Sequence, residues 1–292
     1  MDCFVTSIRA HGRGLSRILY NSGNRVHWIL LAPAVLFLAA FLVLPLLKVI
    51  QFSVTDPTLS LDNYVAFFTN AFYLKTMMKT FMIAFFVATF CLILGYPLAY
   101  VAVRAGGWIA TVLLLAVAMS FWTSFLVRTY AWMVILGTRG PIATLMVALG
   151  FDRPELLFTT FSAVMAMVHI LLPFMTMALY AAMMKIDQNL LRAAASLGAR
   201  PFHAFRAVFL PLSAPGIVSG FSYVFIICLG FYVTPVLLGS PRSQMIAGVI
   251  GNQIEYNPNW GEASAIAVVL LVVTLALFAL YNRFVGLDRL WG

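Results

Sequence analysis

The sequence carries very little charge. Only 9% of its 292 residues are charged, whereas 63% are hydrophobic, and the mean hydropathy is +0.99. Soluble domains contain roughly 45–50% apolar and about 25% charged residues. The basic residues behind the net charge of +9 form no stripe, so they do not indicate a nucleic-acid partner. The composition excludes an ordinary soluble domain and indicates an integral membrane protein.

Acidic residues are missing from the apolar stretches. All nine acids lie outside them, namely Asp2, Asp56, Asp62, Asp152, Glu155, Asp187, Glu255, Glu262 and Asp288. Proton-coupled transporters usually carry acids at mid-membrane, and sodium-coupled ones carry acids or unwound segments there. The absence therefore counts against proton coupling and, more weakly, against sodium coupling.

The motifs of nucleotide and metal chemistry are also missing. No GxxxxGK[ST] is present, so the chain has no P-loop for ATP phosphates. The four histidines show no ligand spacing. Cys3, Cys91 and Cys228 are far apart, and two of them lie in apolar runs, where they suit buried packing rather than a disulfide. We expect no catalytic residue, no metal and no cofactor in this chain.

Long apolar stretches are what the sequence does contain. A bilayer core about 30 Å thick needs about 20 apolar residues in a helix. Six stretches satisfy this requirement: 28–50, 77–103, 108–136, 156–184, 212–238 and 264–284. The first is long for a signal peptide, and no small-residue cleavage site follows it. We expect an all-α polytopic membrane protein with six transmembrane helices.

The distribution of basic residues gives an orientation. With the N-terminus inside, the inner segments hold eleven basic residues, namely Arg9, Arg13, Arg17, Arg25, Arg104, Lys185, Arg192, Arg200, Arg206, Arg283 and Arg289. The outer segments hold five, namely Lys75, Lys79, Arg139, Arg153 and Arg242. The positive-inside rule then favours both termini in the cytoplasm.

The spans divide the chain into segments. We expect a cytoplasmic segment 1–27, a first transmembrane helix 28–50, an extracytoplasmic segment 51–76, a core of five helices 77–285 and a cytoplasmic tail 286–292. The outer stretches 51–75 and 239–263 mix turn residues with apolar ones. They fit short interfacial or re-entrant pieces as well as ordinary loops.

Two ionisable residues lie within spans. Arg128 lies toward the outer end of the third span, where it either lines a polar pathway or extends its charge to the outer interface. His169 lies in the middle of the fourth span, beside Pro173. It is either a neutral histidine bonded to a neighbouring helix or part of a solute path.

A polar, alanine-rich insert, 185–211, separates the fourth and fifth spans. Asp187 can cap a helix on which Leu190, Ala193, Ala194 and Leu197 share one face. Gly198 is a plausible stop, and Pro201 suits the first position of a second helix. We expect a short helix, a glycine break and another short helix that ends at Pro211. The insert is either a docking surface for a cytoplasmic partner or a helix lying on the bilayer.

The insert resembles the EAA motif of ABC-importer permeases. That pattern is EAA, three residues, Gly, nine residues, Ile, one residue and Leu-Pro. Here Arg192-Ala193-Ala194, Gly198, Val208 and Leu210-Pro211 keep the register. Arg192 replaces the family's glutamate, which leaves any salt bridge of that glutamate in doubt, and Val208 conservatively replaces isoleucine.

Nearly the whole chain resembles this family. The stretches FLVRTYAWMVIL and YVTPVLLGSPRSQMIAGVIGNQ resemble its spermidine/putrescine-type branch. The resemblance implies the type I importer fold in a bacterial inner membrane, two ATP-binding cassette subunits that bind ATP and Mg, a second permease that is favoured to be a paralogue, and an extracytoplasmic solute-binding protein. The implied ATPase-coupling residues are Asp187, Leu190, Arg192, Ala193, Ala194, Leu197, Gly198, Leu210 and Pro211.

The branch favours a polyamine as the solute. Arg128 would repel a cation, and the spans offer no carboxylate to attract one. Aromatic faces can bind cations instead. The candidate pathway residues are Trp122, Arg128, Tyr130, Trp132, His169, Tyr223, Phe231 and Tyr232. Two other classes stay open at this point: a stand-alone secondary transporter or channel, and a structural membrane scaffold.

Overall fold

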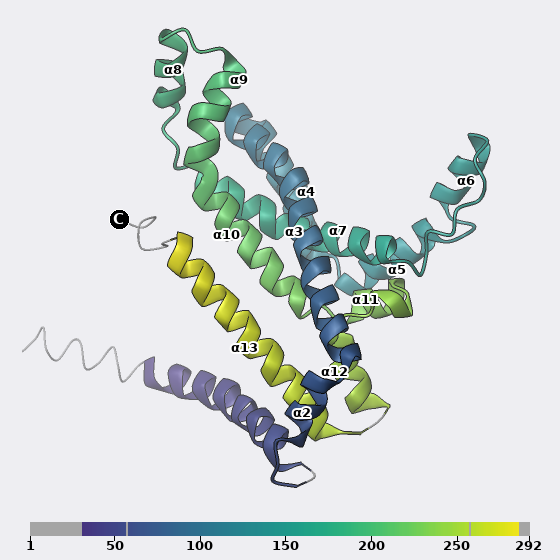
Figure 1. Ribbon diagram of the computed structural model, residues 1–292. Coiled ribbons are helices and arrows are strands. Elements are labelled where there is room, and N and C mark those ends of the chain that lie inside the picture. The colour runs from purple at the N-terminus through teal and green to yellow at the C-terminus, as the bar shows by residue number, and fades with distance from the viewer. Residues whose placement is uncertain (1–30, 57, 257, 286–292) are drawn as a thin grey trace, which may run out of the picture.

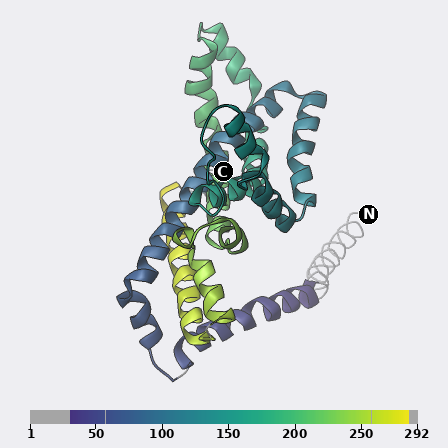
Figure 2. The ribbon, with the colours of Figure 1, turned by 90° about the vertical axis from the view of Figure 1, so that its right-hand side faces the viewer.

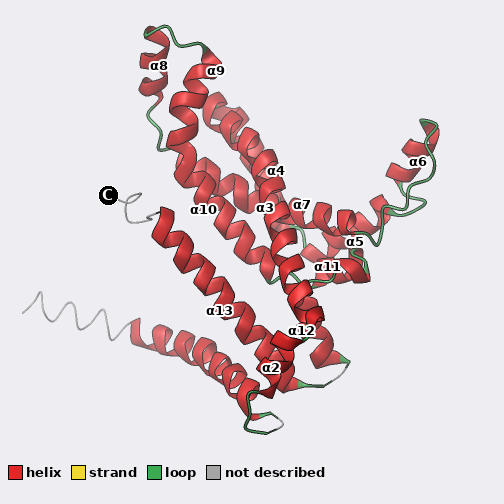
Figure 3. Ribbon diagram, in the orientation of Figure 1, coloured by secondary structure: helices red, strands yellow, loops and turns green. Residues whose placement is uncertain are grey.

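The protein is built from helices. Figure 1 shows the computed structural model, which describes residues 31–56, 58–256 and 258–285, and all regular structure in these ranges is helical (Figure 3). Six helices of this part are long and apolar enough to cross a membrane: Leu31–Thr55, Ala71–Ala105, Phe125–Ala148, Thr160–Met183, Pro201–Leu229 and Trp260–Leu280. The predicted all-α fold with six spans is confirmed. The expected terminal segments 1–27 and 286–292 lie outside the described residues.

The labelled elements follow in chain order. After the first helix, Leu31–Thr55, they are α2 (Asp62–Thr69), α3 (Ala71–Ala105), α4 (Gly107–Trp122), α5 (Phe125–Leu136), α6 (Pro141–Ala148), α7 (Thr160–Met183), α8 (Gln188–Ser196), α9 (Pro201–Ala204), η1 (Phe205–Phe209), α10 (Leu210–Leu229), α11 (Val233–Leu238), η2 (Pro241–Ser243), α12 (Ile246–Glu255) and α13 (Trp260–Val285).

The core forms where α7 packs against α3 and α10. Its largest fully buried side chains include Met167, Leu171, Met175, Leu179 and Met183 of α7. Cys91 of α3 and Cys228 of α10 are completely buried in the same cluster, which confirms that they are packing residues.

Glycines allow α10 to approach α7 closely. A Cβ atom on Gly216 would lie 2.5 Å from the Cβ of Ala182, and one on Gly220 would lie 2.8 Å from the Sδ of Met175. Small residues at such contacts let two backbones come together and gain van der Waals contact in a membrane. The GxxxG pair of α10 is thus part of the helix-packing surface.

A second cluster forms at the end of the molecule that carries α2 and α12. Glu262 of α13 accepts hydrogen bonds from the Tyr73 hydroxyl, from Gln253 Nε2 at 3.1 Å and from Asn259 Nδ2 at 3.0 Å. A Cβ on Gly261 would lie 2.2 Å from the carbonyl oxygen of Asp56, so the chain after the first helix passes directly over α13. These contacts join α3, α12 and α13 at this end.

The predicted bounds of two spans were wrong. The stretch 108–136 is not one helix, because Thr123 and Ser124 adopt extended conformations that separate α4 from α5. Serine and threonine favour helix starts, and hydropathy does not register such a break. The fifth span is a helix over Pro201–Leu229 rather than 212–238, and α11 follows only after a turn at Gly230–Tyr232.

The other spans shift by a few residues. The helix predicted at 77–103 begins at Ala71, and the one predicted at 156–184 begins at Thr160. The described part of the first helix runs from Leu31 to Thr55, beyond the expected end at 50. Short helices, α2 and α12, occupy the stretches that were expected to be interfacial pieces or loops.

The elements give the molecule two distinct ends. In Figure 1, α8 and α9 lie at the top, and α2 lies at the bottom next to the loops around α12. The same separation appears after a quarter turn in Figure 2. The pair α5–α6 extends away from α13 and from the first helix (Figure 1). The first candidate site lies at the α8–α9 end, and the second lies where α5 packs on α7.

The close contact of α10 with α7 predicts a specific loss of stability. Gly216→Ala would force a methyl group onto Ala182 and destabilise the folded protein by about 1–3 kcal/mol. The matched control is Gly230→Ala, because a Cβ there would meet its nearest atom at 3.7 Å. Thermal unfolding in detergent should show a lower midpoint for the first variant only. Equal midpoints for the two variants would contradict the packing.

Candidate functional site

The insert between α7 and α10 forms the local structure expected at its start. Asp187 caps α8 by accepting a hydrogen bond from the Asn189 amide at 2.9 Å. Gly198 has φ of +84°, a left-handed conformation that glycine adopts without a Cβ penalty. Pro201 occupies the first turn of α9. The cap, the glycine break and the start of the second helix are all confirmed.

The tip formed by residues 187–204, here called the α8–α9 tip, exposes large apolar side chains. Leu197 is 89% exposed, Phe202 73% and Leu190 46%. Ala193 is exposed between them, whereas Leu191 packs inward on the main core cluster. Exposed apolar groups gathered on one surface are typical of an interaction site. The small side chain of Ala193 keeps the α8 backbone accessible within this surface.

The second helix of the insert was expected to end at Pro211. In the structure it continues into α10 instead. Leu210 N–H bonds the carbonyl of Phe205, which makes Phe205–Phe209 a π-helical turn. Pro211 explains the widened turn, because proline has no N–H and its ring clashes with the carbonyl four residues earlier. Leu210 and Pro211 therefore lie in the membrane-spanning helix, about 14 Å along it from Pro201 at 1.5 Å per residue.

Aromatic rings fasten this helix to α3. The ring of Tyr100 contacts Phe205 and Phe209 at centroid distances of 5.3 and 5.0 Å. The Tyr96 hydroxyl shares a 2.9 Å hydrogen bond with the Ser213 hydroxyl. The α8–α9 tip is thus continuous with α10, and the start of α10 is held against α3.

Arg192 is exposed on α8. Within the described part of the chain, the only hydrogen bond of its side chain is to Asn189 Oδ1, at 3.4 Å, and the guanidinium forms no ion pair there. Arg104 at the end of α3 donates to Gln188 Oε1 at 3.3 Å and ties α8 to the bundle. Arg192 therefore presents a positive charge on the tip where the family motif has a negative one.

A second candidate site lies at two breaks between apolar helices, one just before the span Phe125–Ala148 and one just after the span Pro201–Leu229. The break between α4 and α5 and the break between α10 and α11 both lie beside α7. The hydroxyls of Thr129 on α5 and Thr234 on α11 are buried and lie 3.3 Å apart. Membrane transporters typically bind solute where such discontinuous helices meet, because their free backbone ends are the polar groups available at that depth.

His169 of α7 and Trp132 of α5 lie together next to this junction. The indole Nε1–H donates to His169 Nδ1 at 3.1 Å, so His169 is bonded to a neighbouring helix, as one of the two interpretations expected. Arg128 lies four residues before Trp132, on the same face of α5. Trp132 thus orients the imidazole of His169, and Arg128 lies one helical turn away along α5.

Aromatic rings extend from the same region along α7. Phe174 contacts Phe121 of α4 at a centroid distance of 4.9 Å and Tyr223 of α10 at 5.6 Å. Phe121 and Tyr223 are about half exposed. Of these three residues the sequence pointed only to Tyr223. Phe121 and Phe174 were missed, because phenylalanine in an apolar stretch gives no signal that separates it from core or lipid-facing residues.

The remaining predicted pathway residues are not part of these groups. Trp122 and Tyr130 are 83% and 55% exposed, and Phe231 packs on the main core cluster. The Tyr232 hydroxyl donates to Glu255 Oε2 at 3.3 Å. Burial and the nearby Glu255 carboxylate raise the pKa of Tyr232, so its hydroxyl stays protonated near neutral pH.

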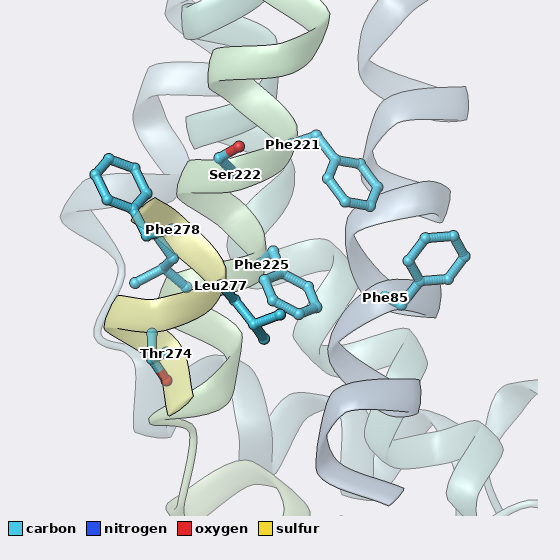
Figure 4. A pocket seen from close by; sticks show the side chains of 8 residues that line it. Phe85, Phe221, Ser222, Phe225, Thr274, Leu277 and Phe278 are labelled. Carbon is cyan, nitrogen blue, oxygen red and sulfur yellow. The ribbon is translucent and has the colours of Figure 1, made fainter. Parts of the chain in front are cut away.

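An apolar groove between α3, α10 and α13 does not fit a polar solute. Phe85, Phe221, Phe225 and Phe278 line it (Figure 4), and its volume is about 260 Å³. Its two hydroxyls are engaged with their own helices: Ser222 donates to Val218 O and Thr274 to Leu270 O. The described residues contain no group of three or more His, Cys, Asp or Glu side chains that could hold a metal ion.

Comparison with known proteins identifies the family. Residues 91–286 match the family described as "Binding-protein-dependent transport system inner membrane component". The chain belongs to this family. It is a permease subunit of an ABC importer, and with six apolar helices it is a multi-pass inner-membrane protein.

Named relatives resemble the permease over most of its length. It is 32% identical over 227 residues to the spermidine/putrescine transport system permease protein PotB of Haemophilus influenzae, covering 77% of this chain and 79% of that protein. It is also 32% identical over 243 residues to the inner membrane ABC transporter permease protein YdcU of Escherichia coli, covering 78% and 76%.

Solved structures share the fold. A bacterial alginate ABC transporter in complex with an alginate pentasaccharide-bound periplasmic protein contains a chain with a TM-score of 0.75 and 18% identity, covering 90% of the permease and 94% of that chain. A chain of the MetNI methionine ABC transporter gives a TM-score of 0.55 at 20% identity, covering 73% and 94%. The type I importer fold expected from the insert is thus confirmed.

The Trp132–His169 hydrogen bond predicts a measurable cost. Trp132→Phe keeps an aromatic ring but leaves His169 Nδ1 without its donor, which should destabilise the permease by about 1–3 kcal/mol. Trp122→Phe is the matched control, because Trp122 is largely exposed. Thermal unfolding in detergent measures both. An unchanged midpoint for Trp132→Phe would show that the bond contributes nothing to stability.

Proposed function

We propose that the permease pairs with a second permease subunit and carries a small polar solute delivered by an extracytoplasmic binding protein. Separate ATP-binding cassette subunits hydrolyse ATP and drive the transport. The observation behind this proposal is the α8–α9 tip, where Leu190, Leu197 and Phe202 are exposed at the end of a helix that continues into the core. A motor that pushes on the tip would move α10 and the helices packed on it.

We also propose that the α8–α9 tip faces the cytoplasm and that both termini lie there. The tip and the helix that follows it carry Arg192, Arg200 and Arg206, and Arg104 ends α3 nearby. Basic residues favour the cytoplasmic side of a membrane protein. The same orientation exposes the tip to ATPase subunits and the α2–α12 end to a binding protein.

ATP and Mg are proposed to bind to the partner subunits. The permease sequence contains no P-loop, and the coupling residues of the tip are placed to make contact rather than to hold phosphate. Asp187 and Gly198 shape the tip, while Leu190, Ala193 and Leu197 form its surface. The permease itself thus supplies the pathway and the coupling surface.

A polyamine is the solute that we favour. The PotB relatives are named as spermidine/putrescine permeases, and the aromatic rings of Phe121, Phe174 and Tyr223 lie beside the helix breaks. Ring faces attract organic cations by about 0.5–2 kcal/mol each. A row of rings can therefore bind a flexible polycation without requiring a carboxylate in the membrane.

Reconstitution tests this function. Vesicles that contain the permease, a second permease and ATPase subunits should take up spermidine or putrescine only when ATP and the binding protein are supplied. Vesicles with the permease alone should take up none. ATP-independent uptake by the isolated permease would instead identify a stand-alone transporter or channel. Efficient uptake of other solutes with no uptake of polyamines would overturn the polyamine assignment alone.

The α8–α9 tip predicts a coupling defect. Leu197→Asp places a charge on an exposed apolar contact and should lower ATP-driven uptake at least about tenfold, since interface hot spots cost 2 kcal/mol or more. The folded permease should be unaffected, because Leu197 has few contacts in its own chain. Leu197→Met is the control, since it keeps an apolar side chain of similar size at the same exposed position. Normal uptake by the Leu197 variant would remove the tip from the coupling assignment.

A further inference from the structure

Arg128 has no partner for its charge within the described chain. It lies in a helix long and apolar enough to span the membrane, and its side chain is half-buried. The Nε atom is buried and makes no hydrogen bond. An unpaired guanidinium in an apolar environment is costly, and such residues almost always pair with another group.

The permease offers no acid to neutralise this charge. Among the six described spans, only the one formed by α13 contains a carboxylate, that of Glu262. Glu262 already accepts hydrogen bonds from three side chains at the α2–α12 end. The neighbouring His169 uses its Nδ1 to accept from Trp132 and cannot supply a negative charge. The described spans therefore offer no free carboxylate to Arg128.

The surface around Arg128 is uncovered. Phe125, Leu126, Val127 and Tyr130 of the same helix are 41–59% exposed, and Trp122 just before it is 83% exposed. Beyond α5, the helix α6 projects away from the other helices (Figure 1) and packs mainly on α5. A short extension with an apolar surface of this kind is stabilised when a second protein covers it.

We propose that a carboxylate of the second permease subunit pairs with Arg128, and that the exposed face from Trp122 to Tyr130 is part of the contact between the two permeases. This inference rests on the proposed pairing of permeases. It fits a cationic solute, because a neutralised Arg128 no longer repels a polyamine at the helix breaks. The second permease fits both observations, because it can supply a carboxylate to Arg128 and an apolar surface to the exposed face, whereas acyl chains carry no charge and a lipid phosphate covers no apolar face.

Such a pair would fix how the two subunits meet. Truncating one partner of a buried ion pair leaves the other charge unpaired and is strongly destabilising, whereas an intact pair specifies register. Arg128 would thus be a residue of the subunit contact that borders the solute path without binding the solute.

The first experiment measures subunit association in the complete importer. Arg128→Gln should lower the amount of second permease that co-purifies with the tagged chain by at least about tenfold. Arg128→Lys should retain more of it, because the charge is kept. Arg153→Gln applies the same substitution to an exposed residue outside the spans and should change nothing. Unchanged association in Arg128→Gln would overturn the proposal.

The second experiment identifies the partner group. Each carboxylate in or near the spans of the second permease is changed to its amide, alone and together with Arg128→Gln. One of these amide variants should lower subunit association as Arg128→Gln does, and the double variant should lower it no further. A charge swap, with Arg128→Glu and that carboxylate changed to Arg, should restore association. Restoration would also exclude misfolding as the cause. Fully additive losses at every position would overturn the proposal.

Uptake measurements separate the other possible occupants. With the assembled Arg128→Lys complex, we expect the solute concentration for half-maximal uptake to stay within about twofold of the unchanged complex. A tenfold change with normal association would show that Arg128 contacts the solute. A defect corrected only by anionic lipid in the vesicles would show that a lipid phosphate occupies the site. Loss of ATP dependence would count against the proposed function without altering the association result.

Discussion

The close packing of α7 between α3 and α10 is the interaction on which the rest of the permease depends. Water gives no hydrophobic drive between helices inside a bilayer, so association relies on van der Waals contact and on small residues that allow it. Gly216 and Gly220 provide that contact along α10. Because α7 also contacts α4, α5 and α11, both helix breaks lie beside the same helix.

The membrane also determines where polar chemistry can occur. A continuous helix satisfies its own backbone groups, so free carbonyl and amide groups appear in a span only where the helix is broken. Here the two breaks meet beside α7, and Thr129 and Thr234 lie together there. Arg128, Trp132 and His169 follow on the same side. Several polar groups of the permease thus lie near these breaks, beside the aromatic rings of Phe121, Phe174 and Tyr223.

The proposed coupling surface and the proposed solute pathway share one helix, α10. Pro211 produces the π-helical turn through which α9 continues into α10, and Tyr96 and Tyr100 hold that turn against α3. An exposed tip on a flexible loop would absorb a push from a partner, whereas a tip continuous with a packed span transmits it. This continuity gives a physical role to the Leu-Pro at the end of the sequence motif, even though Pro211 is distant from the tip.

Local signals in the sequence determined the class of protein, the number of spans and the cap, break and second-helix start at Asp187, Gly198 and Pro201. Each of these features depends only on residues close together in the sequence, because hydropathy, helix capping and a left-handed glycine are local properties. The breaks at Thr123–Ser124 and Gly230–Tyr232 were missed, because an apolar stretch looks the same whether its helix is continuous or not. Only the tertiary structure decided which of the predicted aromatic and ionisable residues lie together, since that depends on how distant helices pack around α7.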